Sequence, residues 1–140
     1  MAEEPTWQET YAPQIRATAE LVQRLMREIP ARQWEQAAVT VDDLVANYRV
    51  MAPAGSWLEG IMAVCMITAG RVAEVAGRPA EGADHMREAI LILQTVGLSY
   101  PHFRNDLPEA VEHLRRLQWV NRGLRPRRRE IGEVNYMHML

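Results

Sequence analysis

Apolar residues recur along the chain at intervals of three and four positions, the spacing that places them on one face of an α-helix. Bounded by proline, glycine and capping residues, the pattern predicts a helix over 6–29 with an interruption at Pro13, and further helices over 31–49, 56–77, 79–97 and 106–123. Sustained alternation of apolar and polar residues, which is typical of strands, does not occur before residue 124. The sequence therefore predicts an all-α fold, either a compact bundle of about five helices or stacked helical hairpins. Residues 1–123 form the helical domain, and 124–140 form a C-terminal extension.

The segment 56–77 is the predicted central helix. Ser56 and Glu59 have the spacing of a capping box, and Gly77 followed by Pro79 is a stop signal. The uncharged run between Gly60 and Gly70 is well short of the ~18 apolar residues that a membrane span needs. We therefore expect a buried helix and no membrane association.

One stripe of this central helix is charged at its ends and uncharged in its middle, where it carries Ala63, Ile67 and Gly70. Small residues allow a second helix to approach closely. We expect these three residues to contact a partner, either the chain's own C-terminal extension or a second copy of the chain.

The amino-acid composition limits the class of protein to which the chain can belong. The chain has 140 residues, 48% of them hydrophobic and 24% charged, which is typical of one globular domain. Its single cysteine, Cys65, lies between apolar neighbours in the central helix, which favours a small buried residue over a nucleophile. The acidic N-terminus lacks the pattern of a signal peptide, so a cytoplasmic location is expected.

The charge is divided unevenly. Residues 1–112 carry nine Arg and sixteen acidic residues, whereas residues 113–140 carry seven Arg and two Glu. Arginine at this density attracts phosphate groups or acidic protein surfaces. The candidate binding residues are Arg115, Arg116, Arg122, Arg125, Arg127, Arg128 and Arg129. The end of the chain is apolar, and its candidate partner-binding residues are Ile131, Val134, Tyr136, Met137 and Leu140.

Two segments, 81–89 and 109–117, are similar to each other. Each has a Glu followed four positions later by a His, in Glu81 with His85 and in Glu109 with His113. Over about residues 79–117 the pattern resembles, weakly and locally, helices of the tetratricopeptide repeat. That resemblance implies stacked helical hairpins that bind a peptide or another subunit.

The same two pairs are candidate metal ligands. Residues four positions apart share a helix face, so side-by-side packing of the two helices would gather Glu81, His85, Glu109 and His113 into one cluster. Exposed pairs without an ion are the simpler interpretation, because the sequence contains neither an HExxH zinc motif nor the Glu-x-x-His order of di-iron bundles.

These patterns favour a non-enzymatic assembly or adaptor protein that binds a protein partner or itself and uses no cofactor. The sequence has no phosphate-binding glycine loop and no G-x-S-x-G nucleophile motif. One alternative is a nucleic-acid-associated subunit that uses the C-terminal Arg cluster. The other is a metal site formed by the two His and Glu pairs.

Overall fold

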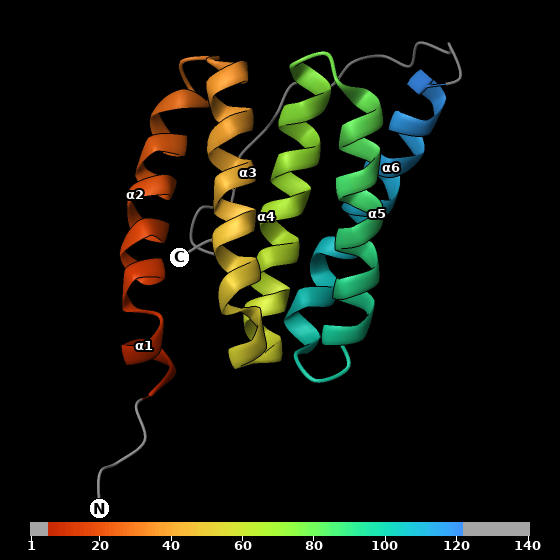
Figure 1. The fold of residues 1–140 in the computed structure, drawn as a ribbon. Coiled ribbons are helices and arrows are strands. Elements are labelled where there is room, and N and C mark those ends of the chain that lie inside the picture. The colour runs from red at the N-terminus through yellow and green to blue at the C-terminus, as the bar shows by residue number, and fades with distance from the viewer. Residues whose placement is uncertain (1–5, 122–140) are drawn as a thin grey trace, which may run out of the picture.

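A computed structural model describes residues 6–121 of the chain, and these residues form helices joined by short turns (Figure 1). The helices are α1 (Trp7–Thr10), α2 (Ala12–Glu28), α3 (Trp34–Met51), α4 (Ser56–Val75), α5 (Pro79–Val96) and α6 (Leu107–Asn121). Two short 3-10 helices, η1 (Ala52–Ala54) and η2 (Pro101–Asp106), precede α4 and α6. Residues 6–121 contain no strand, so the predicted all-α fold is confirmed for them. Gly123 and the predicted extension 124–140 lie outside the described residues.

The long helices are stacked in chain order. Each packs mainly against the helices that precede and follow it in sequence, and α4 makes its largest contacts with α5 and α3. In Figure 1, α2, α3, α4 and α5 stand side by side, with α6 next to α5. From α2 to α6, consecutive α-helices run antiparallel, so α3 and α5 are parallel to each other, and both pack against α4. This is the arrangement of stacked helical hairpins.

Local signals determine where most of these helices begin and end. The Thr6 hydroxyl accepts a hydrogen bond from the Glu9 backbone N–H at 3.3 Å, which caps α1. Gly77 has a φ of 85°, and the backbone N–H of Arg78 donates to the carbonyl of Ala73 at 2.8 Å, which closes α4 with a Schellman motif.

The predicted capping box of Ser56 is wrong. Gly55, in an extended conformation with φ 173° and ψ 150°, occupies the N-cap position of α4 and provides no side-chain cap. The chain reaches α4 directly from η1, so Ser56 is already the first helical residue.

The core lies on both sides of α4 and continues into the contact between α5 and α6. The largest fully buried side chains are those of Val22, Leu25, Val41, Leu44, Tyr48, Met51, Met66, Val72, Met86, Leu93 and Leu117. Among the described residues, no helix is long and apolar enough to cross a membrane. The interior is filled by aliphatic and methionine side chains from all five long helices, together with the aromatic rings of Tyr48 and Phe103.

A close backbone contact joins α4 to α5. A Cβ atom at Gly82 would lie 2.7 Å from the Gly70 carbonyl oxygen, and one at Gly70 would lie 3.0 Å from the Gly82 carbonyl oxygen. Ala63 is fully buried, and Ile67 is partly buried between the two core clusters. At Gly70 the expectation that a second copy or the C-terminal extension covers this stripe is therefore corrected, because α5 of the same chain covers it. For Ala63 and Ile67 the expected partner contact stays a prediction.

Candidate functional site

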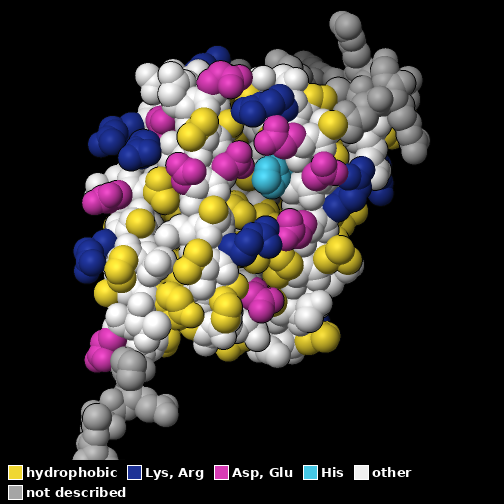
Figure 2. Space-filling model, viewed as in Figure 1, with side chains coloured by type: hydrophobic (Ala, Val, Ile, Leu, Met, Phe, Trp, Pro, Cys, Tyr) yellow, Lys and Arg dark blue, Asp and Glu magenta, His cyan; other side chains and the backbone are white. Residues whose placement is uncertain are grey.

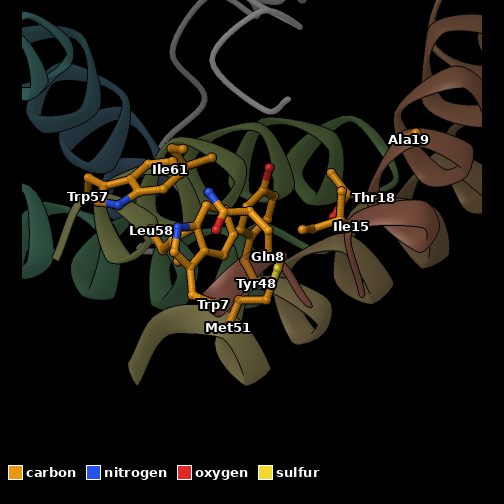
Figure 3. A pocket seen from close by; sticks show the side chains of 10 residues that line it. All are labelled: Trp7, Gln8, Ile15, Thr18, Ala19, Tyr48, Met51, Trp57, Leu58 and Ile61. Atoms are coloured by element: carbon orange, nitrogen blue, oxygen red, sulfur yellow. The ribbon is translucent and has the colours of Figure 1, made fainter. Parts of the chain in front are cut away.

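An apolar pocket of about 290 Å³ lies among α1, the N-terminal half of α2, the C-terminal end of α3 and the N-terminal end of α4. Its walls come from four helices (Figure 3): Trp57 and Ile61 of α4 lie on one side, and Ile15, Thr18 and Ala19 of α2 lie on the other. The remaining lining residues are Trp7 and Gln8 from α1, Tyr48 and Met51 from α3, and Leu58 from α4. The chain thus brings residues far apart in sequence to one end of the stack.

Two tryptophans form one wall of this pocket. The rings of Trp7 and Trp57 meet edge to face, with centroids 5.3 Å apart and an interplanar angle of 75°. The absence of a side chain at Gly55 makes room for this arrangement, because a Cβ there would lie 3.2 Å from the Trp57 ring. The N-cap glycine of α4 therefore also helps to position the indole of Trp57.

The floor of the pocket is part of the protein core. Tyr48, Met51 and Leu58 are each 2% exposed and belong to the main core. Burial raises the pKa of the Tyr48 phenol, a smaller effect of Cys65 adds to this, and a hydrogen bond with Thr18 opposes it. The Tyr48 phenol therefore stays neutral at physiological pH.

Side chains from α2 and α3 are joined by hydrogen bonds beside the pocket. The Asn47 amide donates to the Thr18 hydroxyl at 2.7 Å and to the Gln14 carbonyl at 2.8 Å, while the Thr18 hydroxyl donates to the same carbonyl at 2.9 Å. These bonds hold α2 against α3 at the pocket wall. A pocket with a preformed apolar floor and a fixed polar edge suits the binding of an apolar group.

Cys65 does not add nucleophilic chemistry to this region. It is fully buried, and burial raises the pKa of its thiol. A thiol in that setting is not converted to the reactive thiolate. The prediction that Cys65 is a small buried core residue is confirmed.

The four candidate metal ligands from sequence are not brought together. Glu81 and His85 of α5 face α3, where the His85 Nε2 lies 3.4 Å from an Asp42 carboxylate oxygen. Glu109 and His113 of α6 instead face α4, and Glu109 pairs with Arg71 at 3.6 Å. Side-by-side packing of α5 and α6 places the two pairs on different faces, so the predicted four-residue cluster is wrong.

His113 belongs to a buried polar cluster with Glu74 and Arg116. The Glu74 Oε2 atom lies 2.7 Å from the His113 Nε2 and 2.9 Å from the Arg116 Nη2. The same Arg116 nitrogen lies 3.3 Å from the His113 Nδ1. Because a guanidinium only donates, the Nδ1 of His113 is the acceptor in its contact with Arg116. The cluster joins α6 to α4.

We expect this cluster to make stability sensitive to acid. Burial raises the pKa of Glu74, but hydrogen bonds from His113 and Arg116 and their charges outweigh burial, so the pKa is lowered from its ordinary value of 4.5. A carboxyl with a lowered folded-state pKa stabilises the fold fully above its unfolded pKa and loses that contribution as the pH falls below it. Urea midpoints measured from pH 7 to pH 3 should fall below about pH 4.5, and less steeply in Glu74→Gln. Equal slopes in both proteins would contradict this role of Glu74.

The prediction that Arg116 binds phosphate or an acidic partner is therefore corrected. The carboxylate of Glu74 already pairs with its guanidinium inside the fold. Arg115 is exposed and pairs with Glu112 at 3.5 Å on the same helix. The other candidate arginines (Arg122, Arg125, Arg127, Arg128 and Arg129) and the candidate apolar contacts (Ile131, Val134, Tyr136, Met137 and Leu140) lie outside the described residues.

Sequence reasoning missed the pocket. It predicted the helices that form the pocket, but it did not bring Trp7 and Trp57 together. The available signal was that each tryptophan lies in the first turn of a helix, Trp7 one residue after the Thr6 cap of α1 and Trp57 two residues after the Gly55 cap of α4. Helix starts that meet at one end of a stack place such residues side by side.

Comparisons of the chain with protein-family models, with curated proteins and with solved structures found no match. The similarity of residues 79–117 to tetratricopeptide-repeat helices therefore stays a local resemblance.

Proposed function

We propose that this protein is a non-enzymatic helical adaptor that binds a protein partner by taking one of its large apolar side chains into the aromatic pocket. The observation that carries this proposal is the pocket itself, in which Trp7, Trp57 and Tyr48 surround a preformed apolar space. Tryptophan and tyrosine around a well-packed pocket are the residues that most often dominate the energy of protein–protein binding.

The size of the pocket favours a side chain over a cofactor. At about 290 Å³ it lies at or below the lower end of the ~300–1,000 Å³ that small-molecule sites commonly enclose. Its wall is formed by indole rings that present an apolar face and a polar N–H, so a partner segment can bury one side chain and keep its backbone at the polar edge. Helical or extended partner segments both present such an anchor residue.

Selection from a displayed library of random peptides tests this proposal and does not require the partner to be identified first. We expect peptides selected on the full chain to share a large apolar residue. Trp57→Ala and Ala19→Arg should each weaken their binding by about tenfold or more, because the first removes a pocket wall and the second fills the pocket from an exposed rim position.

Two matched variants serve as controls. Trp119→Ala removes a tryptophan that is 49% exposed on α6, and Ala80→Arg adds the same side chain at an exposed position of α5, which does not line the pocket. Both should bind the selected peptides as the unmodified protein does. Failure to select any peptide, or peptides that bind Ala19→Arg undiminished, would contradict the proposal. A doubled mass in light scattering that Ala19→Arg abolishes would identify a second copy as the occupant.

A further inference from the structure

Three pairs of side chains bridge the parallel helices α3 and α5. The nearest nitrogen and oxygen atoms are 3.6 Å apart in Glu35–Arg78, 3.4 Å apart in Asp42–His85 and 3.0 Å apart in Arg49–Glu88, where Arg78 is the N-cap residue of α5. The α3 members recur every seven residues, so they form one row along the helix. Figure 2 shows a face of the molecule on which acidic and basic side chains are interspersed.

The middle pair differs from the outer two. Each outer pair joins a carboxylate to a guanidinium, which only donates, whereas the middle pair joins the Asp42 carboxylate to the imidazole of His85 and lies beside the carboxylate of Glu81. One carboxylate oxygen from each acid and one nitrogen of His85 all lie within 4.8 Å of one another. Glu81 and His85 share a face of α5 one turn apart, and Asp42 reaches them from α3. The result is a set of three potential ligands supplied by two packed helices.

The donor set and its surroundings suit a transition-metal ion. Zn²⁺ takes imidazole nitrogen and carboxylate oxygen at about 2.0–2.2 Å, so ligands on a common ion stand about 3.5 Å apart. Small side-chain rotations would bring the three atoms to that spacing. The His85 side chain is 22% exposed and that of Asp42 is 44% exposed, which leaves one side of the set open for a water ligand.

We propose that Asp42, Glu81 and His85 bind a divalent transition-metal ion of the Zn²⁺ type, which would link α3 to α5 across α4. The proposal is independent of the peptide pocket, to which none of these three residues contributes. Arg78 competes with the ion, because its guanidinium lies 3.5 Å from the Glu81 carboxylate. We therefore expect Arg78 to lower the affinity for the ion, and we expect its replacement to raise that affinity.

Isothermal titration of zinc chloride into the full chain tests the site. The expected result is one ion per chain, with affinity lowered about tenfold or more in both Asp42→Asn and His85→Gln. His102→Gln, at an exposed position of η2, and His138→Gln, outside the described residues, should bind as the unmodified protein does. Arg78→Gln should bind the ion more tightly, which a merely structural role of these side chains would not produce.

Circular dichroism of each variant shows whether it is folded, and either ligand variant alone decides the question if the other unfolds. Bound Zn²⁺ should also raise the thermal midpoint of the unmodified chain and not that of His85→Gln. Absence of binding to the unmodified chain, undiminished binding to His85→Gln, or loss of binding in His138→Gln would each overturn the proposal. Unchanged or weaker binding in Arg78→Gln would also count against it, because the guanidinium beside the Glu81 carboxylate would then not compete with the ion.

Discussion

Replacing Gly82 by valine is expected to destabilise the protein by about 3 kcal/mol, because it separates α4 from α5. The added Cβ would lie 2.7 Å from the carbonyl oxygen of Gly70. That oxygen is backbone and cannot rotate away, so the two helices must move apart. Met86 and Leu117, which are fully buried beside this contact, would then lose part of their packing. Thermal or urea unfolding followed by circular dichroism measures the loss.

The matched control for this prediction is Gln94→Val, at an exposed position of the same helix. It introduces the same β-branched residue without a clash, so its cost should be only the difference in helix propensity, about 0.5 kcal/mol. If Gly82→Val and Gln94→Val cost the same, the close approach of α4 and α5 would not be the feature that Gly82 provides.

Replacing Arg116 by methionine is expected to cost about 3 kcal/mol, because it leaves the carboxylate of Glu74 buried with only His113 as a partner. Glu74 is 6% exposed, so water cannot replace the lost guanidinium. Methionine keeps most of the apolar stem of arginine, which limits the packing change and makes the loss of charge the main effect. Chemical denaturation at pH 7 gives the difference in free energy of unfolding.

Two further variants isolate the interaction. The double variant Glu74→Leu with Arg116→Met should be less destabilised than the sum of the two single variants, because neither charge is left alone. Arg115→Met, which removes an exposed arginine paired with Glu112, should cost within about 0.5 kcal/mol. A cost for Arg116→Met no larger than that for Arg115→Met would show that the buried cluster does not stabilise the docking of α6.

Much of the helical framework could be predicted from sequence, because its signals are local. Gly77 ends α4 in the left-handed conformation, and Pro79 begins α5, as the pattern indicates. Ser56 shows the limit of such signals. The spacing of Ser56 and Glu59 does not by itself say which residue is the N-cap. In the structure η1 leads into Gly55, which takes the N-cap position, and Ser56 is one position inside the helix.

The partners of individual side chains could not be predicted, because they depend on contacts between distant segments. The small residue Gly70 was correctly interpreted as a point of close helix approach, yet its partner is Gly82 in the next helix rather than another chain. Arg116 looked like part of a basic cluster, and its ion-pair partner Glu74 lies 42 residues earlier. The sequence shows which side chains are charged, apolar or small. The stacking of the helices determines which other side chains they contact.

The three candidate metal ligands show the same difference between local signals and contacts across the fold. The Glu81 and His85 pair was visible as an i, i+4 spacing on one helix. Its third member, Asp42, belongs to α3, which comes within reach of α5 only because both helices pack against α4. A helix-face pattern in one segment cannot identify a ligand that another segment contributes.

The most direct test of the proposed adaptor role is a nuclear magnetic resonance titration of the full chain with a selected peptide. The four tryptophans, Trp7, Trp34, Trp57 and Trp119, each give one indole N–H signal. Binding in the pocket should shift the signals of Trp7 and Trp57 and leave those of Trp34 and Trp119 in place. Peptide binding that moves Trp34 or Trp119 while Trp7 and Trp57 stay unchanged would contradict the assignment of the pocket as the partner site.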